Sequence, residues 1–212
     1  MIPQSADGRL RSSPSAATLV LWRHGVTAWN VDARFQGCNA DNGLTEQGFQ
    51  QARTAAPIVA ALGPTAIFCS PLMRARQTCA AVEPLLGLAA VTDDRLREID
   101  VGDWCGRTSN EILASDPAYA HAIDHRLDYR MGVTGETRME LAARVGQAFQ
   151  ALAEDGECRL IVSHGWALQM GVAHVLGCTY AQSLALRVMG NCAVSVISRK
   201  GGLWRIERWN IG

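Results

Sequence analysis

The sequence predicts an α/β protein, a three-layer α/β/α sandwich with a mainly parallel central sheet and a small helical lid excursion. Two observations indicate this class. Short apolar runs typical of buried strands alternate with longer segments of helical periodicity, and two final strand-like segments flank Gly201-Gly202, as in a hairpin. Such alternation places the strands side by side in parallel, with helices on both faces of the sheet.

The expected strands are short and mostly apolar, because a strand buried on both faces lacks the alternation of a half-exposed one. Thr18 to Trp22 is the clearest example, and Ser70-Pro71 ends the second strand. The predicted strands cover residues 18–22, 66–69, 89–92 and 159–163, followed by a hairpin of 193–198 and 204–209.

Four longer segments are predicted helices, at residues 45–62, 72–86, 137–153 and 166–176. Thr45 can cap the first, Gly63-Pro64 ends it, and Gly87 ends the second. Residues 108–131 are expected to form short helices within a lid excursion that covers 108–135. We expect residues 1–16 to be a disordered tail and residues 17–212 to be a single domain.

The composition excludes several functional classes. Twenty Lys and Arg balance twenty Asp and Glu, so the chain lacks the basic surplus of proteins that bind nucleic acids or anionic membranes. Its seven cysteines are odd in number and form no C-x-x-C pair, unlike a disulfide framework or a zinc site. No apolar run is long enough to span a bilayer. We expect a cytoplasmic protein that binds neither nucleic acid nor membrane, and leave a homodimer open.

Polar side chains follow three of the predicted strands. Arg23-His24-Gly25 follows the first strand, Ser70-Pro71 and Arg74 follow the second, and Ser163-His164-Gly165 follows the fourth. Ligands of parallel sheets bind beyond the carboxyl ends of the strands, so we expect two histidines and two arginines to converge there. A single histidine or arginine after a strand says little, but the joint pattern predicts a site.

Four motifs together resemble the histidine phosphatase superfamily, also called phosphoglycerate mutase-like. They are R-H-G-x-T-x-x-N at residues 23–30, S-P-x-x-R-x-x-Q-T at 70–78, L-R-E-I-x-x-G-x-W at 96–104 and S-H-G at 163–165. The resemblance covers the chain from Leu19 to about Val196. It implies an enzyme that transfers the phosphoryl group of a phosphate ester to a histidine.

The chemistry that the resemblance implies suits these residues. A neutral imidazole is a good nucleophile near pH 7, so His24 would attack phosphorus and become a phosphohistidine. The charge on the phosphoryl oxygens must be balanced as the reaction proceeds. Arg23, Arg74 and His164 would do this as donors, so neither a metal nor another cofactor is expected.

Three further residues are candidates for binding the phosphate or the leaving group. Asn30 matches the last position of the first motif and is implied to donate a hydrogen bond to phosphate. The loop Phe35-Gln36-Gly37 matches a substrate-facing loop of the family, which makes Gln36 and Gly37 candidates for the same site. A plain turn is the alternative for this loop.

A carboxyl group is needed to protonate the leaving alkoxide and later to accept a proton from water. Glu98 is the candidate, since the resemblance favours the first acid of its motif. Asp100 and Asp103 are rivals on chemistry alone, and a turn or surface role is the alternative for both.

Weaker features have alternatives as well. Glu136 is expected either to orient an arginine of the phosphate pocket or to stabilise a helix N-terminus. His121 and His125 are expected to lie on a polar helix face; the alternative is a pair of metal ligands, for which the sequence indicates no third ligand. If the excursion covers the site, Arg126 and Arg130 are candidates for binding a second anionic group of the substrate.

The function we expect is metal-independent hydrolysis of a small phosphorylated metabolite through a phosphohistidine intermediate. The Glu-Ile-x-x-Gly-x-Trp form and the compact excursion favour a phosphatase, with a phosphoglycerate mutase-type phosphotransferase as the alternative. A non-catalytic binding module of the same fold would be expected to have lost His24, Arg74, Glu98 or His164, and all four are present. A secreted acid phosphatase would need a signal peptide and paired cysteines.

Overall fold

The structure is a computed structural model that describes residues 16–212. Its six strands form one sheet in the order β3-β2-β4-β1-β5-β6. The strands β1 to β4 run parallel, whereas β5 is antiparallel to β1 and to β6. The bounds are β1 Ala17–Arg23, β2 Ala66–Cys69, β3 Ala90–Thr92, β4 Cys158–Ser163, β5 Val194–Lys200 and β6 Leu203–Ile211. This arrangement confirms the predicted α/β class, and the tail predicted at residues 1–16 lies outside the described residues except for Ala16.

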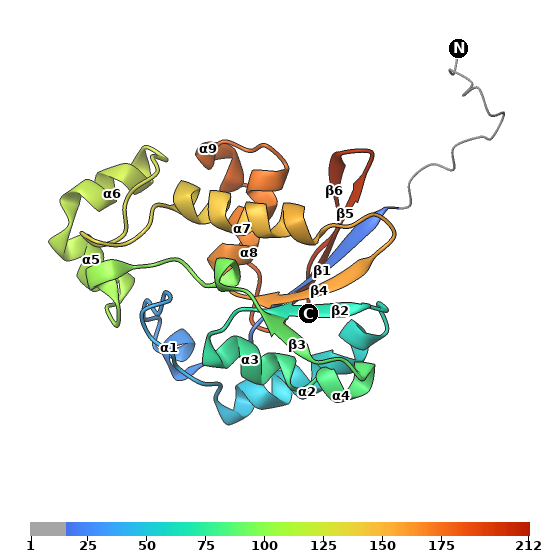
Figure 1. The fold of residues 1–212 in the computed structure, drawn as a ribbon. Helices are drawn as coiled ribbons and strands as arrows, with labels where there is room; N and C mark the ends of the chain where they lie inside the picture. The colour runs from blue at the N-terminus through green and yellow to red at the C-terminus, as the bar shows by residue number, and fades with distance from the viewer. Residues whose placement is uncertain (1–15) are drawn as a thin grey trace, which may run out of the picture.

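Helices cover both faces of the sheet (Figure 1). On one face lie α2 (Glu46–Ala60), α3 (Met73–Cys79) and α4 (Glu83–Leu86); on the other lie α7 (Arg138–Leu152) and α8 (Gly165–Val175). The remaining short elements are α1 (Ala28–Val31), α5 (Ser109–Ser115), α6 (Pro117–Asp124) and α9 (Tyr180–Ser183), with 3₁₀ turns at Asp94–Leu96 and Gly102–Trp104. No helix within residues 16–212 is long and apolar enough to cross a membrane.

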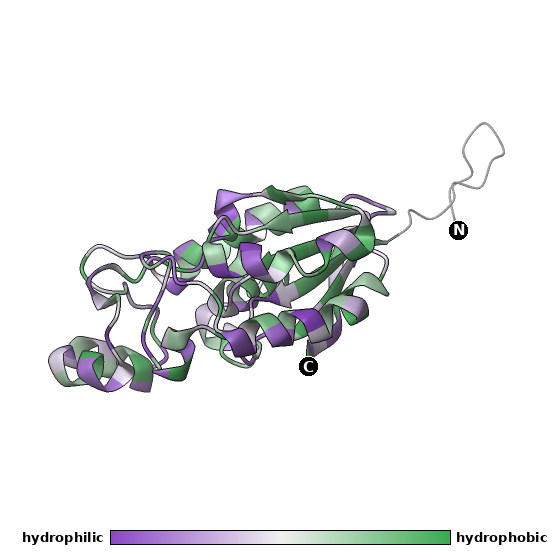
Figure 2. Ribbon diagram, turned by 90° about the horizontal axis from the view of Figure 1, so that it is seen from below, coloured by the Kyte–Doolittle hydropathy of each residue, from purple (hydrophilic) through white to green (hydrophobic). Residues whose placement is uncertain are grey.

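The two layers of core follow from the alternation of side chains along β1. Leu19 and Leu21 belong to the cluster under α7 and α8, whereas Val20 and Trp22 belong to the cluster under α2 and α3. Successive side chains of a strand point to opposite faces, so this one apolar run fills both layers. Figure 2 shows the hydrophobic strands enclosed between helices whose outer sides are more hydrophilic.

The prediction of a single helix over residues 72–86 is wrong, because the structure has two shorter helices there, α3 and α4. Pro84 lies at the start of α4. A proline inside a longer helix would lack the N–H for the carbonyl four residues earlier and its ring would clash with that carbonyl. The chain therefore turns at residues 80–82 and begins a new helix with Pro84 in its first turn.

The excursion, residues 108–135, contains α5 and α6 as expected and lies at the same end of the molecule as α1 (Figure 1). An aromatic cluster joins it to the core, with the ring of Trp104 stacked on Tyr129 at 6.2 Å and packed against Tyr119 at 4.6 Å. The carboxylate of Asp128 accepts hydrogen bonds from the N–H groups of Arg138 and Met139, which fixes the end of the excursion to the start of α7.

Candidate active site

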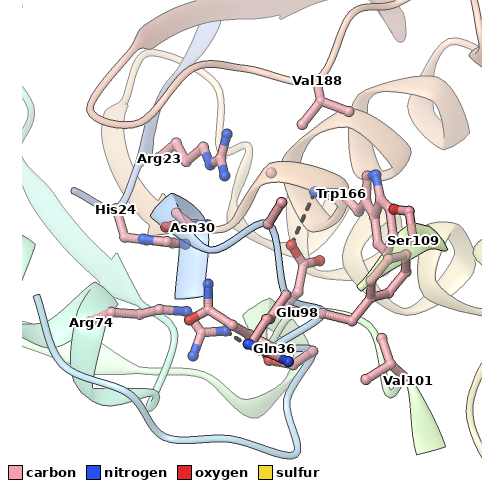
Figure 3. Close-up of a pocket in the computed structure, with 15 residues that line it drawn as sticks. Arg23, His24, Asn30, Gln36, Arg74, Glu98, Val101, Ser109, Trp166 and Val188 are labelled. Atoms are coloured by element: carbon pink, nitrogen blue, oxygen red, sulfur yellow. Dashed lines mark hydrogen bonds between the residues drawn. The ribbon is translucent and has the colours of Figure 1, made fainter. Parts of the chain in front are cut away.

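A pocket opens beyond the carboxyl ends of the parallel strands, and its lining brings most of the predicted residues together (Figure 3). Arg23 and His24 come from the end of β1, and Arg74 comes from the first turn of α3. Seven predicted residues line the pocket: Arg23, His24, Asn30, Gln36, Gly37, Arg74 and Glu98. The eighth, His164, is fully buried next to His24, with their ring centroids 5.1 Å apart.

The imidazole of His24 is held by its own backbone neighbour. Its Nδ1 lies 2.7 Å from the carbonyl oxygen of Gly25, and a carbonyl can only accept, so Nδ1 carries the proton. In the neutral ring Nε2 is then left with its lone pair. Burial, and next the positive charges of Arg74 and Arg23, hold the pKa of His24 well below its ordinary value. The ring is therefore neutral near pH 7, in the form that can attack an electrophile.

Close packing fixes the backbone that carries His24. A Cβ on Gly25 would lie 2.5 Å from the carbonyl oxygen of Gly48 in α2, and a Cβ on Gly48 would lie 2.3 Å from that of Val26. These are distances that real Cβ atoms do not reach, so the loop and the helix approach this closely because both residues are glycine. The N–H of Gly25 also donates to Oγ1 of Thr78 at 3.0 Å.

The second histidine is oriented by Ser70. Nε2 of His164 lies 2.7 Å from the hydroxyl oxygen of Ser70, which itself accepts from the N–H of Leu72 at 3.4 Å. The hydroxyl hydrogen finds no other acceptor within residues 16–212, so it is donated to Nε2 and the proton of the neutral ring lies on Nδ1. Burial is the main cause that lowers the pKa of His164 well below its ordinary value, and the positive charge of Arg74 is the next.

Each of the two arginines is anchored to backbone carbonyls. The guanidinium of Arg74 donates to Gly37 at 2.7 Å and to Ala40 at 3.0 Å, and that of Arg23 donates to Met189. Burial lowers the pKa of Arg74 to about 10, so the group stays charged near pH 7. These hydrogen bonds fix the orientation of both guanidinium groups and leave some of their N–H donors available for a ligand.

Three donor nitrogens of the two arginines and His164 are buried and have no hydrogen-bond partner within the part of the chain that the structure describes. They are Nε of Arg23, Nε of Arg74 and Nδ1 of His164. Buried polar groups are nearly always paired, so an unpaired donor calls for an explanation. All three belong to residues grouped around His24, which is the arrangement expected of a site that binds an anion with several negative oxygens.

The amide groups of Asn30 and Gln36 are oriented by Thr27. Oδ1 of Asn30 accepts from the Thr27 N–H at 3.1 Å and from Nδ2 of Asn191 at 3.2 Å. Oε1 of Gln36 lies 3.0 Å from the Thr27 hydroxyl. Because the oxygens are used in these contacts, the NH₂ groups are the donors that each side chain can offer to a ligand in the pocket.

The carboxylate of Glu98 lies at the N-terminus of α8. Oε1 accepts from the N–H of Ala167 at 2.9 Å and of Ile99 at 3.0 Å, and Oε2 accepts from the N–H of Trp166 at 3.1 Å. The first N–H groups of a helix have no partner within the helix, so a carboxylate is favourable there. Figure 3 shows Glu98 between His24 and Arg74 on one side and Trp166 on the other.

Residues 19–212 match the histidine phosphatase superfamily (branch 1). The chain belongs to this superfamily. A relative in Erwinia tasmaniensis, named probable phosphoglycerate mutase GpmB, is 34% identical over 191 residues, which are 89% of this chain and 88% of that protein.

Two solved structures have a similar fold. The complex of mycobacterial glucosyl-3-phosphoglycerate phosphatase with VO3 is 32% identical, with a TM-score of 0.81 over 92% of this chain and 100% of that chain. The phosphoserine phosphatase of Entamoeba histolytica, solved with 3-phosphoglyceric acid, also has a TM-score of 0.81 over 92% of this chain and 97% of that chain. Its identity is 24%, so it shows likeness of fold alone.

In this member of the histidine phosphatase superfamily Glu136 pairs with Arg144 of α7, at 2.6 Å and 2.9 Å. Arg144 does not line the pocket. It donates instead to the backbone carbonyls of Arg95, Arg97 and Glu98. The ion pair thus supports the segment that carries Glu98. Neither predicted role of Glu136 describes this contact, because the arginine it orients lies outside the pocket.

The idea that Arg126 and Arg130 bind a second anionic group finds no support, since neither lines the pocket. The guanidinium of Arg130 is bound to Glu140 and to the carbonyl of Gly135. Arg126 lies two residues after the end of α6 and has a positive φ of 54°. Both follow α6, whereas the residue of the excursion that lines the pocket is Ser109 at the start of α5.

The rivals of Glu98 lie outside the pocket as well. Oδ1 of Asp100 accepts from the N–H of Gly102 and from Nδ2 of Asn39, both at 2.8 Å, which is a turn role. Asp103 is exposed. His121 and His125 stack at 3.9 Å, and within residues 16–212 no three His, Cys, Asp or Glu side chains gather as a group that could hold a metal.

The sequence reasoning missed Asn191, which donates to the carbonyl of His24 at 3.1 Å and to Asn30. The N–H of Cys192 also donates to the His24 carbonyl. Both residues lie in the turn just before β5, which is antiparallel to β1. The start of an antiparallel strand lies beside the end of its neighbour, so polar residues before a strand of the final hairpin were the signal that could have identified them.

Proposed function

We propose that this protein is a phosphomonoester hydrolase that acts without a metal, through a phosphohistidine on His24, on a small phosphorylated metabolite. The observation that carries the proposal is the group of three buried donors, without a hydrogen-bond partner within residues 16–212, around a neutral imidazole whose Nε2 keeps its lone pair. Such a site presents a nucleophile and preorganised positive groups to the same phosphoryl group.

The first step forms a bond between Nε2 of His24 and phosphorus and breaks the bond from phosphorus to the ester oxygen. Arg23, Arg74 and His164 donate to the phosphoryl oxygens as this happens. Glu98, in its protonated form, gives a proton to the leaving alkoxide. The imidazolium that results keeps its Nδ1 proton on the Gly25 carbonyl.

The second step releases the phosphate. A water molecule attacks phosphorus while the Glu98 carboxylate takes its proton, and the bond from phosphorus to Nε2 breaks. His24 returns to the neutral imidazole and Glu98 to its protonated form, so the two steps together consume one water molecule and one ester.

The names of the relatives favour phosphorylated small molecules as substrates. The mycobacterial relative is named a glucosyl-3-phosphoglycerate phosphatase, and the Erwinia relative a probable phosphoglycerate mutase. The second name keeps a mutase as the alternative function. A mutase would convert 3-phosphoglycerate to 2-phosphoglycerate with little release of phosphate, so both products should be measured.

The experiment is phosphate release from a panel of esters, with a chelator present, by the wild-type protein and by His24→Ala. We expect turnover in chelator, loss of at least 10³-fold in His24→Ala, and an acid-labile phosphoryl group on the wild-type enzyme after a rapid quench. His125→Ala, an exposed histidine outside the pocket, is the matched control. A strict need for a divalent metal, or substantial turnover by His24→Ala, would overturn the proposal.

A further inference from the structure

The pocket has a second half that the phosphoryl chemistry does not use. The volume of the whole pocket is about 220 Å³, which is more than a phosphate fills. Its apolar lining residues are Ala33, Phe35, Val101, Trp166 and Val188. In Figure 3 Trp166 and Val101 lie on the side of Glu98 away from Arg74, and Phe35 packs against Trp166. A leaving alcohol would therefore face this apolar half.

Trp166 is the largest side chain of this half, and its ring is held in place on two sides. The guanidinium of Arg138 lies 4.5 Å from its ring centroid, a cation–π contact. The ring of Phe35 packs against it edge-to-face with centroids 5.5 Å apart. Arg138 covers one face of the indole, so the opposite face is the preformed flat surface, and a ligand that stacks on it has little side-chain ordering to offset.

The same residue connects this surface to the acid. The backbone N–H of Trp166 binds Oε2 of Glu98, while its side chain lines the pocket. An alcohol protonated by Glu98 is therefore released next to the indole. Because the contact with Glu98 is made by the backbone, a substitution of the side chain removes the flat surface and retains that hydrogen bond.

Charges are sparse in the outer half. Arg34 is the cation that lines it, and its guanidinium is tied to the carbonyl of Gly106 at 2.7 Å. Ser109 adds one hydroxyl. A second anionic group on the alcohol would meet one exposed, already engaged arginine. This lining suits an uncharged group with a flat face better than a carboxylate.

We propose that the outer half of the pocket binds the ring of the leaving alcohol, which stacks on Trp166, so that the preferred substrates are phosphomonoesters of uncharged, ring-bearing primary alcohols. This inference rests on the proposed hydrolase function. A sugar ring and an aromatic ring share the required flat face, since the C–H face of a sugar also packs on an indole.

The test compares esters of matched alcohols, so that the leaving group differs in shape and little in reactivity. Benzyl phosphate is paired with ethyl phosphate, and glucose 6-phosphate with glycerol 1-phosphate; 3-phosphoglycerate represents a second anionic group. For each ester kcat/KM is measured with wild type, Trp166→Leu and Trp166→Phe. The inhibition constant of inorganic phosphate reports separately on the part of the pocket around His24 and the arginines. Val133→Ser, at an exposed position in the excursion, is the control variant.

In each pair we take the ratio of kcat/KM for the ring-bearing ester to kcat/KM for the small ester. We expect Trp166→Leu to lower this ratio by about tenfold in at least one pair, and Trp166→Phe to lower it less. The pair that changes identifies the ring as aromatic or sugar. Phosphate inhibition should change less than threefold. If Trp166→Leu does not fold, Val188→Ser at an exposed position should lower the same ratio in the same direction.

Two results would overturn the inference while leaving the hydrolase function in place. One is an unchanged ratio in the folded variants, or an equal loss for all the esters. The other is a wild-type preference for 3-phosphoglycerate over both ring-bearing esters. Failure of the wild type to hydrolyse any of the five esters would instead count against the proposed function itself, and the inference would fall with it.

Discussion

The hydroxyl oxygen of Ser70 lies 2.7 Å from Nε2 of His164, and both side chains are fully buried. Through this contact a residue that does not touch the pocket determines which ring nitrogen of His164 carries the proton. With Ser70 as donor the proton lies on Nδ1, the nitrogen that has no protein partner within residues 16–212. Ser70 is therefore a positioning residue.

Ser70→Ala is expected to lower kcat/KM by about 10²-fold, since loss of one oriented donor costs 10²–10³ in rate. Without the serine hydroxyl the ring proton can move to Nε2, and the lone pair of Nδ1 then faces the phosphoryl oxygens. Steady-state kinetics and the inhibition constant of inorganic phosphate, which should rise, measure the effect. Ser183→Ala removes another fully buried hydroxyl, at the last residue of α9, and should change neither. Unaltered phosphate inhibition in Ser70→Ala would contradict the assignment.

The two buried histidines predict how stability depends on pH. Burial is the main cause that lowers the pKa of His24 and of His164 in the folded protein, whereas in the unfolded chain each imidazole titrates at about 6.5. Below that pH the unfolded chain binds protons that the folded protein does not. The free energy of unfolding should therefore be greatest above pH 6.5 and fall as the pH decreases toward the lowered folded-state values.

Each histidine contributes up to about 1.4 kcal/mol per pH unit to this fall. Urea unfolding at pH 7.5, 6.0 and 5.0 measures it, and His24→Asn should show a shallower fall than wild type. His125→Asn, at an exposed position, should match the wild-type slope. Identical slopes for wild type and His24→Asn would show that His24 is not held neutral by burial.

The ion pair of Glu136 and Arg144 predicts a separation between catalysis and phosphate binding. Glu136→Gln keeps the shape of the side chain but removes the charge that holds Arg144 under the carbonyls of residues 95–98. We expect kcat to fall about tenfold because Glu98 is less well placed. Inhibition by inorganic phosphate should hardly change.

Glu140→Gln is the matched control for the Glu136→Gln variant. Glu140 lies near the start of α7, the helix that also carries Arg144, and pairs with Arg130 at the surface. Its kcat should stay within twofold of wild type. If Glu136→Gln weakened phosphate inhibition as much as it lowered kcat, the ion pair would support the whole pocket and not the Glu98 segment in particular.

The convergence of His24, His164, Arg23 and Arg74 could be predicted because each follows a strand or lies in the turn after one. Parallel topology brings the carboxyl ends of neighbouring strands together, whatever the remaining packing. The strand segments were equally predictable, since their apolar runs are short and bounded by Gly, Pro or polar residues. Family motifs added Asn30 and Glu98 to what the strand ends indicated.

The residues that support the site could not be read from the sequence in the same way. No local sequence pattern indicated that Ser70 orients His164 or that Asn191 contacts His24, because each acts through hydrogen bonds to residues more than 90 positions away. Arg144 likewise meets the Glu98 segment across more than 40 positions. Such contacts depend on how α3, α7 and β5 pack, which residue spacing does not encode. Pro84 did carry a local signal, and the prediction of one helix over 72–86 overlooked it.

The contact of Gly25 with Gly48 limits how the loop that carries His24, the proposed nucleophile, can be altered. Hydrogen bonds around His24 depend on pH, and charge pairs weaken with salt, but the exclusion of a Cβ at either glycine is independent of both. A side chain at one glycine cannot be accommodated by a smaller residue at the other, because glycine is already the smallest. The distance between the His24 loop and α2 should therefore be the same in any solvent in which the protein stays folded, and redesign of this enzyme has to treat the two positions as one.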